Sequence, residues 1–152
     1  VPEDEIEEVY ALRAQIEVYA ARRVVARQPE EAARDLQEIV DGMEEAGRAG
    51  DLPALADRDL QFHDTLLQLS GYQGLHRIWR SMDGLVRART YARLAAMDDR
   101  EFVGRTALIH QPIVDAIRAG DADAAEAAVA GHITTMPDAL KGKGELREAR
   151  DE

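Results

Sequence analysis

The sequence predicts an all-α domain, an antiparallel bundle of about six helices, from three observations. Apolar residues recur at three- and four-residue steps along most of the chain, which is the spacing of one face of a packed helix. Helix start and stop signals separate these stretches, among them Pro29, Gly50, Asp51, Gly71 and Gly120. The 152 residues, 45% of them hydrophobic, suffice for one domain with its own core.

The first two helices are expected over 2–28 and 29–49. Pro2 suits a first helical turn, and the acidic residues after it complement a helix N-terminus. Gly50 is the C-cap of the second helix. The inward residues of the first helix are expected to be Ile6, Val9, Leu12, Ile16 and either Tyr19 or Ala20, and those of the second Ala33, Leu36, Val40 and Met43.

The third helix, between the N-cap Asp51 and Gly71, organises the rest of the chain. Its apolar stripe contains Leu52, Leu55, Phe62, Leu66 and Leu69. Asp59 takes one position of this stripe, where a leucine would be expected. His63 lies on the same side, because residues four apart are neighbours on a helix surface.

Three more helices are expected after Gly71, over about 72–96, over about 100–119 following the break at 97–99, and after Gly120. Pro112 lies inside the second of these and should kink it. The sequence RAGD occurs at 48–51 and at 118–121, and each copy places a C-cap glycine before an N-cap aspartate, a tight connection between antiparallel helices. The residues of 72–96 expected to face the core are Leu75, Ile78, Trp79, Met82, Leu85 and Val86.

Composition excludes several classes of protein. The formal net charge is −11 and no basic cluster or helix-turn-helix motif is present, so this chain by itself is not expected to contact nucleic acid. The sequence contains no run of about 18 apolar residues, so no membrane span is predicted. Cysteine is absent, which fits a reducing cytoplasm. The segment 141–152 is charged and is expected to be a frayed or partly disordered tail.

Histidine takes an inward position in two further helices, at His110 and His132. They lie ten residues before and twelve residues after Gly120, which corresponds to roughly 15 and 18 Å along two antiparallel helices. The two rings are therefore nearly level and can meet, and Asp59 and His63 can join them if the third helix packs alongside. The fourth histidine, His76, is peripheral and is interpreted as non-functional.

One carboxylate and up to three imidazoles predict a divalent metal site. Imidazole suits Zn, Ni, Cu or Fe, and a mixed nitrogen and oxygen set also admits Mn; we expect Zn first, with Ni or Mn as the alternatives. The competing interpretation is four independent core residues. A single inward histidine usually donates to a backbone carbonyl, but four buried polar groups without compensation would be costly, which favours the metal.

At these residues the sequence resembles a known family. The order Asp59-x-x-Phe62-His63, LLQLSG, His110-x-x-Ile113, Gly120-Asp121 and His132 is similar to the FCD domain, the effector-binding domain of FadR-type GntR transcription regulators of bacteria. The resemblance covers roughly 4–140, so 1–140 is expected to be one FCD-like domain. It implies a bundle with a central metal and effector cavity, metal ligands Asp59, His63, His110 and His132, and a homodimer in the cytoplasm.

The resemblance also implies a function. Such domains sense small hydroxy, sugar or dicarboxylic acids and modulate a winged-helix DNA-binding domain, which this chain lacks. The family's first-helix pattern falls on Arg13 and Glu17, and its pocket arginine on Arg87 or Arg89; Arg13, Arg87 and Arg89 are thus the expected effector ligands. From the residues alone, Arg13 lies at the edge of its stripe, where a snorkelling arginine is the competing interpretation.

Two features depart from the family's pattern. Tyr72 stands where the family commonly has Asn, which could alter the edge of the pocket. Pro112 follows His110 by two residues, and its kink could re-aim that ligand.

Two other functions fit these residues less well. A metal-dependent enzyme acting on a small carboxylate would need a general base that is not a metal ligand. No inward residue is an obvious base of this kind, and Glu17 is only the best remaining candidate. We therefore expect no enzyme. A metal-free helical dimerisation scaffold would retain no metal and would lose no stability on Asp59→Ala.

Overall fold

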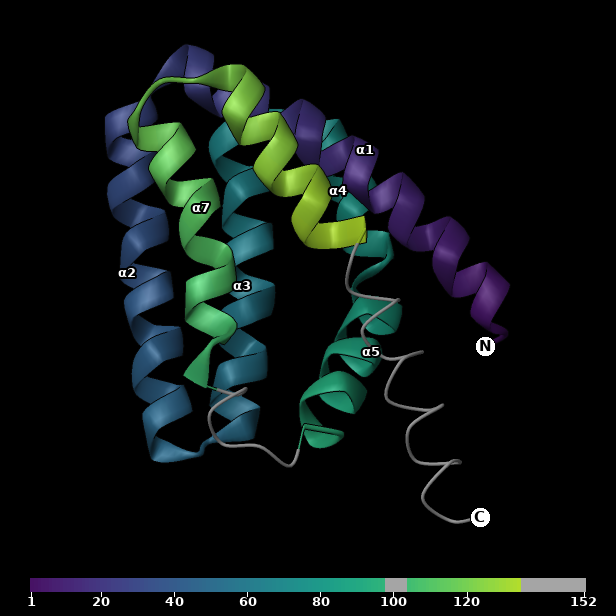
Figure 1. Ribbon diagram of the computed structural model, residues 1–152. Helices are drawn as coiled ribbons and strands as arrows, with labels where there is room; N and C mark the ends of the chain where they lie inside the picture. The colour runs from purple at the N-terminus through teal and green to yellow at the C-terminus, as the bar shows by residue number, and fades with distance from the viewer. Residues whose placement is uncertain (98–103, 135–152) are drawn as a thin grey trace, which may run out of the picture.

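The computed structural model describes residues 1–97 and 104–134, and every regular element within them is a helix (Figure 1). The predicted all-α fold is therefore confirmed. The expected break at 98 and 99 and the charged tail over 141–152 lie outside the described residues. The helices are α1 (Glu3–Arg27), α2 (Pro29–Ala49), α3 (Leu52–Ser70), α4 (Gln73–Ser81), α5 (Asp83–Ala95), α7 (Thr106–Arg118) and a last helix over 122–134.

Helix α2 lies at one side of the bundle and packs against both α3 and α7 (Figure 1). Helix α1 packs on α3, and α4 and α5 lie against α3 further along the chain. The helix over 122–134 is joined to α1 through Arg22, which forms ion pairs with Asp123 at 2.9 Å and Glu126 at 2.7 Å. None of the described helices is long and apolar enough to cross a membrane.

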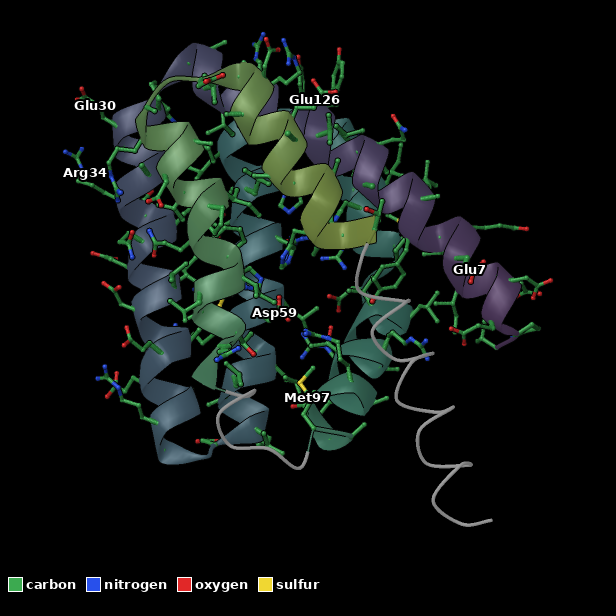
Figure 2. All side chains as sticks on the ribbon, in the orientation of Figure 1. Glu7, Glu30, Arg34, Asp59, Met97 and Glu126 are labelled. Atoms are coloured by element: carbon green, nitrogen blue, oxygen red, sulfur yellow. The ribbon has the colours of Figure 1, made fainter. Side chains whose placement is uncertain are left out.

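The core is one large cluster drawn from these helices, with Leu36, Met43, Phe62 and Ile117 among its most buried side chains. A second, smaller cluster surrounds Trp79 of α4 and holds α1, α3 and α4 together; it contains Ile16, Ala20, Leu67 and Trp79. Charged side chains such as Glu7, Glu30 and Arg34 project away from the bundle, whereas Asp59 lies among the helices (Figure 2).

The two RAGD connections are confirmed as equivalent junctions. Gly50 and Gly120 both have positive φ, at 67° and 70°. The residue after each glycine donates its N–H to a carbonyl of the preceding helix, Asp51 to Ala46 and Asp121 to Ala116. Each aspartate then caps the next helix by accepting the N–H three residues on, at 3.1 Å for Asp51 and 3.0 Å for Asp121. Both junctions therefore turn the chain back at a defined residue.

Gly71, which ends α3, occupies a tighter position than Gly50. Its φ is 73°, and a Cβ built there would lie 1.8 Å from Nη1 of Arg27, which donates to the Ser70 carbonyl at 3.0 Å. We expect Gly50→Ala to lower the free energy of unfolding by about 1–2 kcal/mol through the backbone alone. Gly71→Ala should cost about 1 kcal/mol more, since Arg27 must give up its hydrogen bond. Urea denaturation of both variants measures this difference, and equal losses would contradict it.

Two details of the helices differ from the expectation. The helix expected over 72–96 is two helices, α4 and α5, which meet at Met82 (φ −91°, ψ −4°). Gly84 in the first turn of α5 lowers the local helix propensity and helps to explain the break. Ile78 of α4 is also 53% exposed rather than inward.

The buried face of α1 is predicted in part: Ile6, Ile16 and Ala20 are buried as expected, but other positions differ. Leu12 and Tyr19 are 52% and 59% exposed, while Tyr10, Arg13 and Glu17 are buried. The prediction failed at these positions because the buried face carries a charged pair, and charged residues were assigned to the outside.

Candidate metal centre

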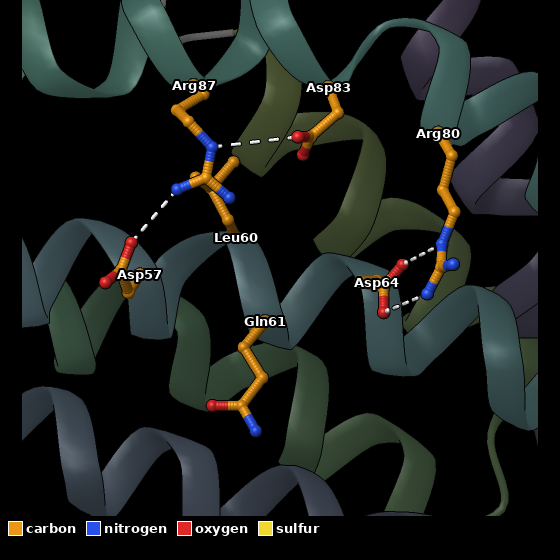
Figure 3. Close-up of a pocket in the computed structure, with 7 residues that line it drawn as sticks. All are labelled: Asp57, Leu60, Gln61, Asp64, Arg80, Asp83 and Arg87. Carbon is orange, nitrogen blue, oxygen red and sulfur yellow. Dashed lines mark hydrogen bonds and ion pairs between the residues drawn. The ribbon is translucent and has the colours of Figure 1, made fainter.

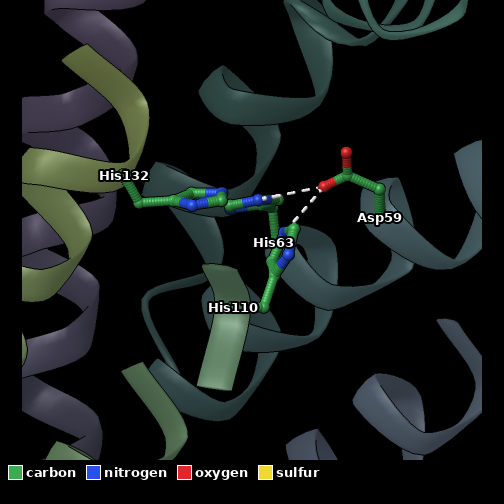
Figure 4. Close-up of side chains that lie close together, drawn as sticks. All are labelled: Asp59, His63, His110 and His132. Carbon is green, nitrogen blue, oxygen red and sulfur yellow. Dashed lines mark hydrogen bonds and ion pairs between the residues drawn. The ribbon is translucent and has the colours of Figure 1, made fainter. Parts of the chain in front are cut away.

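Four predicted residues meet in the interior of the bundle (Figure 4). Asp59 and His63 come from consecutive turns of α3, His110 from α7 and His132 from the helix over 122–134. Each offers one atom that can bind a metal, and these atoms lie within 4.8 Å of one another. All four side chains are buried. The convergence of these residues, predicted from their spacing, is confirmed.

The hairpin about Gly120 brings the two later histidines level. The ring centroids of His110 and His132 are 4.2 Å apart, and the ring of His63 lies 5.4 Å and 5.3 Å from them. Phe62 packs edge-on against His63 and His110, with centroids at 5.4 and 5.0 Å. The apolar ring of Phe62 therefore restrains the positions of these two imidazole rings. Pro112, although inside α7, does not keep His110 from the cluster.

Asp59 is an ionised carboxylate with a different partner on each oxygen. Its Oδ1 lies 2.9 Å from Nε2 of His110, and its Oδ2 accepts from Nη2 of Arg93 at 2.7 Å. Burial alone would raise the pKa of Asp59, but His110, His63 and Arg93 together hold this pKa well below its ordinary value. The cluster therefore contains a permanent negative charge.

His110 presents Nε2 to that charge. Its Nδ1 donates to the backbone carbonyl of Thr106 at 2.7 Å, so Nδ1 carries a hydrogen. Nε2 and Oδ1 of Asp59 would then both be acceptors, facing each other at 2.9 Å, unless a proton or a metal ion lies between them. This pair of atoms is thus arranged to share a cation.

His63 and His132 complete the donor set. Nδ1 of His63 contacts Oε1 of Glu17, while its Nε2 is buried without a hydrogen bond, 3.4 Å from Oδ1 of Asp59. Burial and the charge of Arg13 lower the pKa of His63, but the charge of Glu17 and the contacts with Asp59 and Glu17 together outweigh them, so the net shift is upward. The pKa of His132 is well below its usual value because of burial and the neighbouring histidines. His132 is therefore neutral, the form that binds metals.

The donor set fits a metal of the expected kind. Three imidazoles and one carboxylate without thiolate match the ligand chemistry of Zn and Ni, and admit Mn. Arg93 already pairs with Oδ2 of Asp59, but the facing acceptors Nε2 of His110 and Oδ1 of Asp59 favour a cation between them. Asp59, His63, His110 and His132 therefore have the chemistry to bind a divalent ion.

Of the arginines near this centre, the structure singles out one that was not predicted. Arg93 of α5 is 5% exposed and contacts Asp59 directly. A sequence signal for it existed, because Arg93 follows Val86 by seven residues and so lies on the buried face of α5. Arg13 is also buried, which contradicts the snorkelling interpretation, and its Nε donates to Glu17 at 2.6 Å.

The structure does not bring Arg87 and Arg89 to the histidines. Arg87 is half exposed and pairs with Asp57 and Asp83 in a surface groove of about 650 Å³ between α3, α4 and α5 (Figure 3). Arg89 pairs with Glu3 at 2.6 Å. None of the four clustered residues lines that groove. Tyr72, the departure from the family's pattern, stacks on Tyr19 with ring centroids 5.1 Å apart.

Glu17 is a poor general base. Its Oε2 accepts from Arg13 and from Nε1 of Trp79 at 3.1 Å, and its Oε1 contacts His63. Burial would raise its pKa, but Arg13, His63 and the hydrogen bonds lower it to about 2. A carboxylate so occupied and so weakly basic has no lone pair directed at a substrate.

The described residues form an all-helical domain built around a buried three-histidine, one-aspartate cluster. The FCD domain family matches residues 8–135, so the chain belongs to this family, the effector-binding domains of GntR-type regulators. This confirms the resemblance drawn from the sequence.

One similar protein is named as a transcriptional repressor. The chain is 27% identical over 131 residues to the "Probable D-xylose utilization operon transcriptional repressor" of Paenarthrobacter nicotinovorans, covering 86% of this chain but only 56% of that protein. The fold of this chain is similar to that of E. coli McbR/YncC, with a TM-score of 0.78 and 15% identity; the match covers 97% of this chain and 68% of McbR/YncC. The fold is also similar to that of Streptococcus agalactiae GntR, with a TM-score of 0.63 and 25% identity; the match covers 90% of this chain and 60% of that protein.

Proposed function

We propose that this domain senses a small organic acid with the help of a divalent metal ion and thereby modulates a GntR-type transcription regulator. Asp59, His63, His110 and His132 would hold the metal, with Zn first and Ni or Mn as alternatives. The observation that carries the proposal is the convergence of four buried donor atoms within 4.8 Å. When bound, the metal would supply a Lewis-acidic charge that attracts carboxylate oxygens.

The effector's class follows from the charges around the centre. Arg93 and Arg13 are buried cations beside the cluster, and an acidic ligand gains from both the metal and a guanidinium. Arg87 and Arg89 remain predicted effector ligands; they pair with Asp57, Asp83 and Glu3 rather than with the four clustered residues. A hydroxy, sugar or dicarboxylic acid has the required carboxylate. The net charge of −11 argues that DNA is bound by a separate winged-helix domain.

Coupling to DNA would run through a homodimer in which ligand binding changes the arrangement of two DNA-binding domains. By linkage, the effector changes DNA affinity only as far as its own affinity differs between the two arrangements. An enzyme using the same centre is disfavoured because Glu17 is fully engaged by Arg13, Trp79 and His63.

Elemental analysis tests the metal centre. We expect about one equivalent of a transition metal in wild-type protein purified without chelators or a His tag, and little in a His110→Ala/His132→Ala variant, because two of four ligands are then missing. His76→Ala is the matched control, since His76 pairs with Asp64 at 2.7 Å outside the cluster and its loss should leave the metal bound.

No metal in the wild type, even after soaking with Zn, Ni or Mn, would overturn the four-ligand centre. The histidines would then be core residues or direct partners of an effector. With metal bound, a thermal-shift screen of hydroxy, sugar and dicarboxylic acids identifies the effector's class, and no shift from any of them would contradict the sensing of organic acids.

A further inference from the structure

Glu17 of α1 is a fully buried carboxylate that contacts a candidate metal ligand. We infer that Glu17 is a positioning residue for the metal centre, which fixes His63 with its Nδ1–H toward Glu17 and its Nε2 toward the cluster. This inference rests on the proposed function, because it concerns how His63 is prepared to bind the metal. Glu17 itself lies on the far side of the imidazole and is not one of the four clustered residues.

The contacts of the His63 ring decide its tautomer. A neutral imidazole carries one hydrogen, so one nitrogen donates and the other offers a lone pair. An ionised carboxylate only accepts, and Glu17 contacts Nδ1, so the hydrogen belongs on Nδ1. The lone pair then lies on Nε2, which is buried, makes no hydrogen bond and faces Asp59. The nitrogen left for a metal is thus the one that points to the other donors.

Glu17 is itself held rigidly by two other helical turns. Arg13, one turn earlier on α1, donates to Oε2 at 2.6 Å, and Trp79 of α4 donates to the same oxygen at 3.1 Å. Trp79 is 2% exposed and belongs to the same buried cluster as Ile16 and Leu67. The frame formed by Arg13, Glu17 and Trp79 therefore connects α1 and α4 to a ligand on α3.

The two orienting groups in the centre differ in charge. His110 is oriented by a neutral backbone carbonyl, that of Thr106, whereas His63 is oriented by a carboxylate. A carboxylate raises the basicity of the imidazole it contacts and so strengthens the metal bond, and removing such partners commonly costs 10–100-fold in metal affinity. A purely structural Glu17, serving only to neutralise Arg13, would have no such effect.

The test is a Zn²⁺ competition titration against a chromogenic chelator for wild type and Glu17→Gln. Glutamine keeps the shape and can still accept from Nδ1–H, but it lacks the charge, so we expect Zn²⁺ affinity to fall by about 10–100-fold. Asp64→Asn is the matched control: it removes the charge of a carboxylate that also contacts a histidine, His76 at 2.7 Å, but that pair lies outside the cluster, so this variant should bind Zn²⁺ nearly as wild type does.

Nitrogen-15 NMR of the His63 ring in Zn-loaded wild type supplies a readout that needs no variant. We expect a protonated Nδ1 and a metal-bound Nε2. Binding through Nδ1, or unchanged affinity in Glu17→Gln, would overturn the role of Glu17 while leaving the metal centre standing. Absence of Zn²⁺ uptake by the wild type would instead overturn the proposed function, and this inference with it.

Discussion

Asp59→Ala is expected to lower the free energy of unfolding of the metal-free protein by about 3–5 kcal/mol and to abolish metal uptake. The substitution leaves the guanidinium of Arg93 and Nε2 of His110 without the carboxylate that both contact, and both groups are buried. Removing one partner of a buried ion pair leaves the other charge buried without compensation, and this costs more free energy than the intact pair contributed to stability. Urea denaturation in the presence of a chelator measures this loss.

Asp64→Ala is the matched control, about one and a half turns further along α3. Asp64 also contacts a histidine and an arginine, His76 and Arg80, but Arg80 is 63% exposed. Such surface pairs contribute about 0–1 kcal/mol, so the control should lose little stability. Asp59→Ala with the stability of the wild type would contradict the prediction and support a metal-free dimerisation scaffold.

Zinc is expected to stabilise the wild-type domain strongly. A ligand that binds only the folded state adds about 4.1 kcal/mol at a free concentration of a thousand times its dissociation constant. The four donors come from three helices that only the folded chain brings together, so the unfolded chain lacks the site. Thermal unfolding with excess Zn²⁺ and with a chelator should therefore give clearly different Tm values.

The His110→Ala/His132→Ala variant separates this effect from binding elsewhere. Its Tm should be the same with Zn²⁺ and with chelator. An equal rise in the variant would place the zinc at another group, for example the aspartates Asp57, Asp64 and Asp83 that line the surface groove, and would contradict the proposed centre.

The features that could be predicted from the sequence are those that depend on the spacing of residues close together in the chain. The stripe of α3 made Asp59 conspicuous because a carboxylate occupied a position that periodicity reserved for a leucine. The two RAGD segments could be interpreted without tertiary information, because a C-cap glycine and an N-cap aspartate act within a few residues. The level placement of His110 and His132 then followed from helical rise alone.

The remainder depended on contacts between distant segments. Arg13 and Glu17 are charged, and only Trp79 and His63, brought in by other helices, make their burial favourable. For the same reason the predicted face of α1 missed Arg13 and Glu17 and included the exposed Leu12. Among the arginines of α5, the neighbouring positions 87, 89 and 93 are chemically alike, and the choice of Arg93 is made by Asp59 on another helix.

The fixed junction at Gly120 also limits how this domain can change over evolutionary time. It turns the chain at one residue, and the distances from it to His110 and His132 are set by counting residues along two helices. Inserting or deleting one residue between Gly120 and His132 would swing that ring by about 100° around its helix. Point substitutions on the outer faces of these helices leave the count intact. Lineages that keep the site are therefore free to vary in side chains there but not in length.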